Sequence, residues 1–522
     1  MTLAIINRLH YKLLVLALLS FLGATRTIMA IGETTHPIDV GSNKQLLFDP
    51  RFLEESSGVK LQMNRPFQDP EPVLVADQPW ELSLSGHHTV MFDQGKFRMW
   101  YNAIGSRKRD GESATRVQCY AESTDGVHWQ KPDLQLIEYD GNAHNNIVYP
   151  SDPRAAVNGA SIFRDEHAAE AERYKSWYKF YPSKEQAAHG IKRGTYASVS
   201  PDGLRWKRLG PDRGYPLSRG QASDSQNICF WDADLEKYIG FVRKKRMGPP
   251  PRDRTCWVGL MTSDDFENWT MAEDIFRADE QFKIPGGKAD WLPPVDLYAP
   301  GGMKVPGVPN AYILLPTNYY HWESDQSPAT IDVGLATSRD LIHWWQPAPA
   351  NREPFLRLGP DDSAHAGMLF AFPWPIVVEN EIWTYFSATN RFHNGKQKLP
   401  TKSGIFRARL RRDGFVSVDA GYRGGEFTTP VLAFEGGRLE LSLDGSAGGW
   451  LQVEIQSPDG TPIDGYGIND CDTIRGNSFT KTITWRGLSD MSRLAHTPIR
   501  LRFVMRSMKL FAFQFRESTD DD

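Results

Sequence analysis

Three acidic residues in this sequence stand where carboxyl groups could act as a general acid and a general base: Glu81, Asp224 and Asp296. Each has apolar or small polar neighbours, in "DQPWELSLSG", "QASDSQNICF" and "LPPVDLYAP". Acid–base catalysis needs one carboxyl group that keeps its proton and one that is ionised, and an aromatic wall such as Trp80 raises a carboxyl pKa by desolvation. We expect Glu81 or Asp296 as the acid and Asp224 as the base or orienting group.

Hydrogen-bonding and aromatic side chains near these acids are candidates for substrate binding. They are Trp80, His87, His88, Arg243, Tyr298, His365 and the cluster "NYYHW" at 318–322. Imidazole, guanidinium and phenol groups can bond to hydroxyl groups. The alternative for each acid is a turn cap or an ion pair between sheets, and for the His pair it is packing. Two other acids, Asp49 and Asp332, are placed within strands, which favours a structural role.

A recurring pattern, Ser-x-Asp-x-x-x-Trp, identifies the elements that must position these side chains. It begins at Ser123, Ser200, Ser263 and Ser338, and a degenerate copy stands at 413–415. Recurrence of one pattern at roughly regular intervals is typical of a repeat architecture. In each copy we expect Asp to cap a turn and Trp to pack between sheets. Because these residues recur, they are scaffold, and chemistry must come from residues that differ between copies.

Short strands with period-2 alternation precede each copy, and the absence of long helical periodicity predicts an all-β protein. Five units predict a five-bladed β-propeller with the first strand of each blade at the axis. The expected blades are 82–135, 145–210, 222–278, 290–348 and 364–420, with the strand at 44–50 completing the last. The three candidate acids then precede the first strands of blades one, three and four, which converge on one face. Blade two offers Asn158 at that place, and blade five offers Asp362 and His365.

The pattern changes after residue 421. Segments such as "GRLELSLDG" and "GWLQVEIQSPDG" alternate strictly between apolar and polar residues, as expected for a two-sided antiparallel sandwich. The expected organisation is a signal peptide at 1–30, a propeller at 31–421, a β-sandwich at 422–516 and an acidic tail at 517–522. The signal peptide is indicated by a basic start followed by the apolar run "LLVLALLSFLGA", which is too short to span a bilayer of about 30 Å.

The short turns "STDGVHW", "SPDGLRW" and "SRDLIHW", the five-blade count and the C-terminal sandwich resemble the invertase, levansucrase and arabinanase superfamily, glycoside hydrolase families 32, 43, 62 and 68. The resemblance covers roughly residues 45–516. It implies three carboxylates at the funnel end of the axis. The chain lacks the families' Trp-Met-Asn-Asp-Pro-Asn-Gly, Arg-Asp-Pro and Glu-Cys motifs, and "LLFDPR" at 46–51 only faintly matches the first.

The resemblance implies a secreted glycoside hydrolase that acts on a poly- or oligosaccharide through a pair of carboxylates. Two alternatives remain open: a non-catalytic carbohydrate-binding propeller, and a glycoside phosphorylase or transferase, which would need His and Arg in the funnel. His88, Arg243 and His365 are the candidates for that role. No cofactor is required for hydrolysis, and a structural Ca²⁺ ion on the axis is left open.

Composition excludes some partners and leaves others open. The net charge of −4 over 522 residues, with no long basic run, argues against nucleic acid. No segment after residue 30 is long and apolar enough for a membrane span, so we expect a secreted or periplasmic protein without a membrane partner. Cys229 and Cys256 fall in one blade, where either a disulfide or two buried thiols is expected. Oligomeric state is left open.

Overall fold

The computed structural model describes residues 36–109, 113–150, 155–209, 225–246, 255–277, 295–321, 328–347, 353–371, 374–395 and 401–518. The predicted signal peptide, Asp224 and residues 519–522 lie outside these ranges. No helix in the described ranges is long and apolar enough to cross a membrane. Helical structure there comprises α2 (Lys184–Ala188) and the short 3-10 segments η1 (Pro50–Phe52), η2 (Glu170–Glu172) and η3 (Ser492–Leu494).

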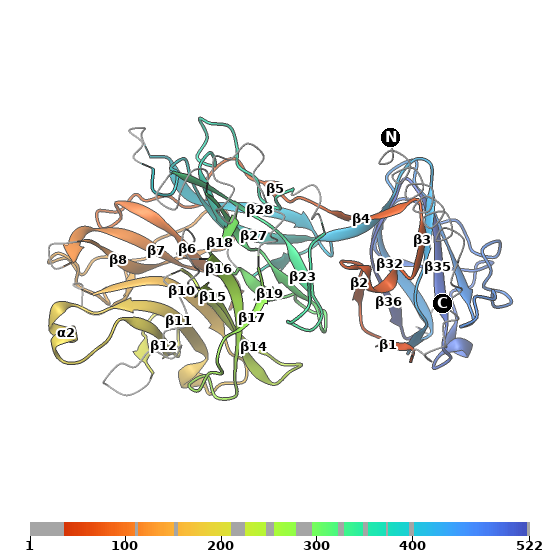
Figure 1. The fold of residues 1–522 in the computed structure, drawn as a ribbon, viewed down its shortest axis with the longest axis horizontal. Helices are drawn as coiled ribbons and strands as arrows, with labels where there is room; N and C mark the ends of the chain where they lie inside the picture. The colour runs from red at the N-terminus through yellow and green to blue at the C-terminus, as the bar shows by residue number, and fades with distance from the viewer. Residues whose placement is uncertain are drawn as a thin grey trace, which may run out of the picture. The chain divides into compact units, whose positions relative to one another are not determined.

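Five blades form a β-propeller, as predicted (Figure 1). Four of them are separate four-stranded sheets, and the fifth is part of an eight-stranded sheet. Blade 1 comprises β6 (Ser83–Asp93), β7 (Lys96–Arg109), β8 (Ser113–Ser123) and β9 (Ile147–Tyr149). Blade 2 comprises β10 (Ala156–Arg164), β11 (Tyr174–Tyr181), β12 (Gly194–Ser200) and β13 (Lys207–Arg208). Blade 3 comprises β14 (Ile228–Asp232), β15 (Lys237–Arg246), β16 (Thr255–Ser263) and β17 (Glu273–Phe276).

Blade 4 is accompanied by a short ladder of strands that is continuous with the sheet of blade 5. Blade 4 comprises β19 (Gly302–Lys304), β20 (Tyr312–Leu314), β23 (Ala336–Ser338) and β24 (Trp344–Trp345). Blade 5 comprises β25 (Met368–Ala371), β27 (Glu381–Thr389), β28 (Ser403–Arg411) and β5 (Phe67–Gln68), with β26 (Ile376–Val378) beside β27. The upper part of blade 4 is a separate ladder of β18 (Val295–Leu297), β21 (Thr317–His321) and β22 (Ala329–Val333). Strand β22 pairs in parallel with β25, which joins this ladder to blade 5.

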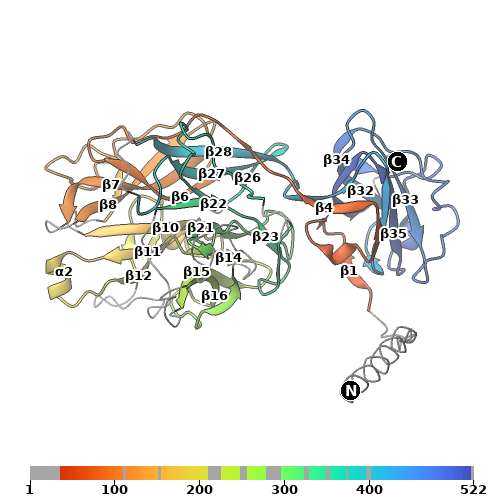
Figure 2. The ribbon, with the colours of Figure 1, turned by 45° about the horizontal axis from the view of Figure 1, so that its top comes forward.

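The first strands of the blades lie against one another around the axis. Contacts join β6 to β10, β10 to β14, β14 to β19, and β25 to β6. Both views show the sheets following one another in chain order, from orange to cyan (Figure 2). The starts of these strands therefore meet at one end of the axis and their ends meet at the other. We call these ends the front mouth and the rear mouth.

Ring closure differs from the prediction. The strand expected to complete blade 5, at 44–50, instead provides β2 (Gln45–Leu46), which pairs with β36 (Met508–Arg516) of the second domain. Blade 5 is completed by β5, which pairs with β28. The segment that closes the ring is the one that enters blade 1 directly, so the earlier strands are available to the sandwich.

The second domain is a β-sandwich. One sheet contains β4 (Val59–Met63), β29 (Val416–Ala420), β36 (Met508–Arg516), β32 (Arg438–Asp444) and β34 (Asn477–Thr482), with β2 beside β36. The other contains β3 (Glu55–Ser57), β30 (Gly425–Thr428), β35 (Arg500–Arg506) and β33 (Trp450–Gln456). Strands β1 (Ile38–Gly41) and β31 (Leu432–Phe434) form a further pair. The strand pairing thus places β2, β3 and β4 in the sandwich, although the sequence predicted a propeller from residue 31 to 421.

The four complete copies of the repeated pattern form the same capped turn in blades 1 to 4. In blade 1, Ser123 donates to Asp125, and the Asp125 Oδ1 accepts the backbone N–H groups of Val127 and His128 at 2.8 Å each. The indole of Trp129 donates to the Gly126 carbonyl. In blade 4, burial alone would raise the pKa of Asp340, but the hydrogen bonds of the turn outweigh burial and lower this pKa to about 2. The prediction that the motif is scaffold is confirmed.

A second repeat links successive blades and was not recognised in the sequence. The Asp at or just after the end of a first strand accepts a hydrogen bond from a Tyr in the second strand of the next blade. The pairs are Tyr174 with Asp93, Tyr238 with Asp165 at 2.7 Å, and Tyr312 with Asp232 at 2.6 Å. The signal in the sequence is an acid that ends one apolar run and a Tyr near the start of the second strand in the next unit.

Candidate active site

The front mouth contains a buried cation stacked on an aromatic ring. Arg243, near the upper end of β15 in blade 3, is 8 % exposed, and its Cζ lies 4.2 Å from the ring centroid of Tyr298 in blade 4. A guanidinium over an aromatic face is attracted by the ring quadrupole, and the attraction increases when water is excluded. The two predicted substrate-binding residues Arg243 and Tyr298 are therefore brought together.

Aromatic and imidazole groups from blades 1 and 5 continue this cluster. The Tyr298 ring centroid lies 5.7 Å from that of Phe370 and 5.3 Å from that of His393. His393 Nδ1 lies 3.1 Å from the hydroxyl of Tyr319. His87 of blade 1 reaches the same group, with its ring 6.3 Å from Phe370. Four of the five blades thus contribute a side chain to one cluster.

Asp296 is the predicted acid that the structure places next to this cluster. Its Oδ1 accepts the backbone N–H of Cys256 in blade 3 at 2.9 Å, and the residue is 8 % exposed. Asp296 is opposite Tyr319 in the β18–β21 ladder. Two residues later, the backbone N–H of Tyr298 donates to the carbonyl of Thr317 and so continues this ladder. Side chains two residues apart in a strand share a face, so Asp296 and Tyr298 face the same side.

Glu81, another predicted acid, is held away from this cluster. Its side chain is fully buried and accepts hydrogen bonds from Tyr101 at 2.6 Å and from Lys131 at 2.7 Å. The neighbouring Trp80 donates its indole N–H to Asn146 and packs in the core of blade 1. Glu81 therefore forms a buried ion pair on the face of blade 1, which corresponds to the structural alternative for this residue.

Of the predicted histidines, His87 reaches the cluster, whereas His88 and His365 lie outside it. His88 Nδ1 lies 3.1 Å from the Ser387 hydroxyl of blade 5, and burial lowers the pKa of His88 to about 3, so its ring is neutral. His365 packs edge-on against Phe406, with ring centroids 4.3 Å apart, and burial also lowers its pKa. Both imidazoles join parts of the scaffold. Sequence reasoning did not select two residues of the cluster: Phe370, which lies in β25, the first strand of blade 5, and His393, which follows β27.

The start of blade 3 is tied to its neighbours. Asp224 itself lies outside the described residues, and Ser225 and Gln226 follow it, both buried. Gln226 donates to the carbonyls of His88 at 3.0 Å and Ala160 at 2.7 Å. This hydrogen bonding connects blades 1, 2 and 3 at the axis. Asn158, the blade 2 candidate, is 8 % exposed at the start of β10.

Asp332 has a raised pKa on the other face of the blade 4 ladder. It aligns with Asn318 and Leu297, whereas Asp296 aligns with Tyr319, so the two acids are on opposite faces. Burial raises the pKa of Asp332 to about 6, although Asn318 and Tyr320 donate hydrogen bonds that oppose this effect. A carboxyl group kept partly protonated near neutrality reduces folding stability when it ionises.

We expect Asp332→Asn to stabilise the protein above pH 6 and to have little effect at pH 4. Native Asp332 binds its proton more tightly than the unfolded group, whose pKa is near 3.8, so the free energy of unfolding falls as pH rises from about 4 to about 6. This shift corresponds to up to about 3 kcal/mol. Urea denaturation of both proteins at pH 4 and pH 7.5 measures it. An equal change at the two pH values would contradict the assignment to ionisation.

The described ranges contain no group of three or more His, Cys, Asp and Glu side chains that could hold a metal ion. The structure therefore identifies no ligand set in those ranges for the Ca²⁺ ion considered from the sequence. All four cysteines are buried free thiols, so Cys229 and Cys256 follow the thiol alternative.

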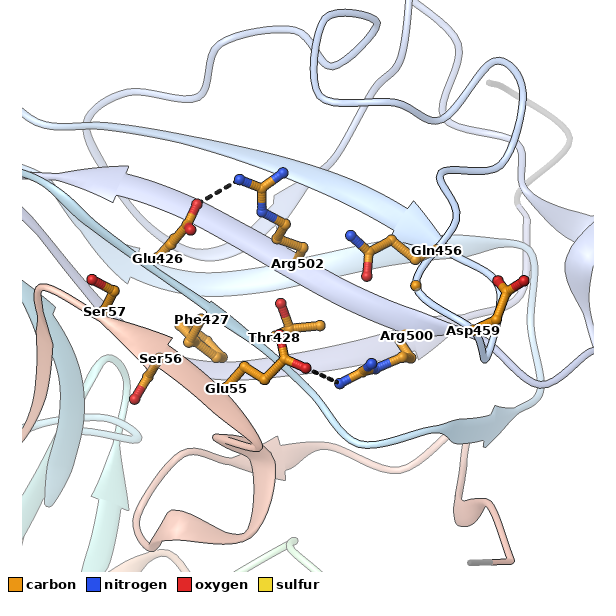
Figure 3. Close-up of a pocket in the computed structure, with 11 residues that line it drawn as sticks. Glu55, Ser56, Ser57, Glu426, Phe427, Thr428, Gln456, Asp459, Arg500 and Arg502 are labelled. Atoms are coloured by element: carbon orange, nitrogen blue, oxygen red, sulfur yellow. Dashed lines mark hydrogen bonds and ion pairs between the residues drawn. The ribbon is translucent and has the colours of Figure 1, made fainter. Parts of the chain in front are cut away.

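A polar groove of about 500 Å³ lies on the β3–β30–β35–β33 sheet of the sandwich (Figure 3). Arg502 pairs with Glu426 at 2.6 Å and Glu454 at 3.3 Å. Arg500 pairs with Glu54 and Glu55. Because each guanidinium has two carboxylate partners, the groove is a ladder of cross-strand ion pairs, and we assign it no ligand.

Comparisons with known proteins find limited similarity. No family model matches the chain. Two uncharacterized proteins of Mycobacterium tuberculosis, from strains CDC 1551 / Oshkosh and H37Rv, are 33 % and 32 % identical over 167 residues. The match includes 32 % of this chain and 45 % of each relative, so the chain spans about half the length of the curated relatives it matches.

Among solved structures, a glycosyl hydrolase from Bacteroides ovatus is 15 % identical, with a TM-score of 0.41, and the match covers 71 % of this chain and 97 % of that one. An N-acetylgalactosamine deacetylase from F. plautii, in complex with blood group B trisaccharide, is 13 % identical, with a TM-score of 0.43 and coverage of 69 % and 97 %. Both TM-scores are below 0.5.

Proposed function

We propose that this protein is a glycoside hydrolase whose substrate binds at the front mouth, with Asp296 as general acid and Asp224 as base or orienting group. The observation that carries the proposal is that Asp296 faces the same side as Tyr298, where Arg243, Phe370 and His393 gather. Glu81 has no part in the proposed mechanism because Lys131 and Tyr101 hold it inside blade 1.

The composition of the cluster suits a sugar. A sugar ring has an apolar C–H face, which an aromatic ring such as Tyr298 can cover, and hydroxyl groups, which guanidinium and imidazole groups can bind. In the proposed mechanism, Asp296 donates its proton to the leaving glycosidic oxygen while the second carboxylate activates water or attacks the anomeric carbon. The distance between the two carboxyl groups would determine the stereochemical outcome.

Hydrolysis of a substrate panel tests this proposal. The protein without residues 1–30 is incubated with furanosides, fructans and acidic polysaccharides, and reducing sugar is measured beside the Tyr298→Ala variant. We expect turnover on one substrate class, with at least a 10-fold higher KM in Tyr298→Ala because the ring that covers the sugar is lost. Retention on a polysaccharide without any turnover would replace the hydrolase with the non-catalytic carbohydrate-binding protein.

A phosphorylase is the second candidate, and one observation favours it. Arg243, His87 and His393 all lie in the cluster at the front mouth, and such groups can bind phosphate. The assay is therefore repeated with inorganic phosphate. Production of a sugar phosphate in place of reducing sugar would assign the protein to this class.

Secretion, which residues 1–30 predict, completes the proposal because it would bring the enzyme to extracellular polysaccharides.

A further inference from the structure

The rear mouth is a cavity at the opposite end of the axis from the proposed active site. It encloses about 410 Å³, within the range of about 300 to 1,000 Å³ typical of small-molecule sites. All five blades line it at or near the ends of their first strands, including Phe92 in blade 1, Arg164 in blade 2, Trp231 in blade 3, Lys304 in blade 4 and Trp374 in blade 5. The cavity is thus separate from the residues of the front mouth.

Aromatic rings form its walls and part of its rim. Trp231 is half-buried, and His167 stacks on it with ring centroids 4.7 Å apart and planes 2° apart, which fixes the orientation of the indole. Trp374 packs against Phe230 with centroids 5.9 Å apart and has a φ of 93°, a strained conformation for a residue other than glycine. Such strain often accompanies functional sites. Phe92 at the rim is 54 % exposed.

The charges at the rear mouth are already balanced. Arg164 pairs with Asp93 at 2.7 Å and with Glu166 at 3.2 Å. Lys304 pairs with Asp232 at 2.6 Å and with Asp234 at 2.7 Å. A phosphate or sulfate would have to displace carboxylates from these cations, which disfavours an anionic ligand. Fixed ion pairs nevertheless present both donors and acceptors to a neutral ligand.

We propose that the rear mouth is a second binding site that takes a neutral saccharide unit, independent of the front mouth. The indoles of Trp231 and Trp374 cover the apolar face of a sugar ring, and the ion pairs of Arg164 and Lys304 bind its hydroxyl groups. A site on the opposite side of the propeller would hold one part of a long polysaccharide, or a second chain, while the front mouth acts on another. The site would therefore affect binding to polymers more than turnover of short substrates.

Isothermal titration with cellohexaose, xylohexaose, arabinohexaose and mannohexaose tests the site. The titrated protein carries Tyr298→Ala, which weakens binding at the front mouth, and binding is assigned to the rear mouth by its loss in rear-mouth variants. We expect at least one hexasaccharide to bind and Trp231→Ala to weaken it by at least 10-fold. Phe92→Ser, at a position that is 54 % exposed, should weaken it several-fold. Unchanged melting temperatures confirm that the variants fold.

Two outcomes would overturn the proposal: no binding of any of the four hexasaccharides, or binding that Trp231→Ala and Phe92→Ser leave unchanged. Binding of a detergent or an apolar peptide alone would also overturn it, because the ligand would then be apolar. Hydrolysis by the otherwise unaltered protein is measured separately, with the rear variants as controls that should keep turnover of short substrates. Failure of the rear site and failure of the proposed hydrolase are thus distinguishable.

Discussion

Asp296→Asn should lower kcat by about 10²- to 10⁴-fold and leave the fold intact. The amide removes the proton that we assign to the leaving oxygen, and positioned general acids contribute about this factor. Asparagine keeps an oxygen that can accept the Cys256 N–H, which Asp296 accepts at 2.9 Å, so the β18 edge should keep its contact with blade 3. The measurement is kcat on the substrate identified from the panel, together with the melting temperature of both proteins.

A matched control comes from the same blade. Asp340 caps the repeated turn by accepting the N–H groups of Ile342 and His343, and Asp340→Asn makes the same chemical change at a scaffold position. The amide oxygen can still accept these N–H groups, so the change removes mainly the exposed charge pair with His343, should cost no more than about 1 kcal/mol of stability, and should leave kcat unchanged. Equal kcat losses in the two variants would show that Asp296 acts only through the stability of blade 4.

The architecture was predictable because its signals are local. A Ser, an Asp and a Trp within seven residues form a complete turn through their own backbone, as Asp125 and its neighbours show, so each copy specifies its structure without distant partners. Four complete copies and the degenerate copy at 413–415 then define five blades. Ring closure is not local: whether residues 44–50 or 67–68 pair with β28 depends on which strands the distant sandwich takes, and β36 takes β2.

The candidate site was predictable only where strand position decides the outcome. Asp296 and Tyr298 come just before β19, the first strand of blade 4, so their position in the sequence is enough to place them at the front mouth. Glu81 occupies the corresponding place before blade 1, but Lys131, fifty residues later, draws its carboxylate into an ion pair. His87 rather than His88 reaches the front mouth because the register shifts between Leu84 and His88. A register shift of this kind exchanges the sides of the sheet on which two adjacent residues, here His87 and His88, lie. No residue type in "LSLSGHH" indicates the shift.

The buried ion pair of Glu81 leads to the largest expected effect on stability. Lys131→Met should cost about 3 to 5 kcal/mol, because it leaves a buried carboxylate without its cation. Glu81 has no exposed side-chain surface, and its carboxylate would keep the hydrogen bonds from the Tyr101 hydroxyl and the Asp77 N–H but no cation. Urea denaturation at pH 7 measures the free energy of unfolding.

The double variant Lys131→Met/Glu81→Gln separates this mechanism from lost packing. With both charges removed, the remaining amide can still accept the Tyr101 hydroxyl, so the double variant should recover most of the stability that Lys131→Met loses, as expected when an uncompensated charge is the cause. If the losses in free energy of unfolding of the two single variants simply add in the double variant, the aliphatic part of Lys131 supports blade 1 by packing. The Nζ of Lys131 lies 5.6 Å from the Tyr101 ring centroid. Recovery would also explain why a residue placed like a catalytic acid serves the scaffold: its charge is tolerated in the core only because Lys131 is buried with it.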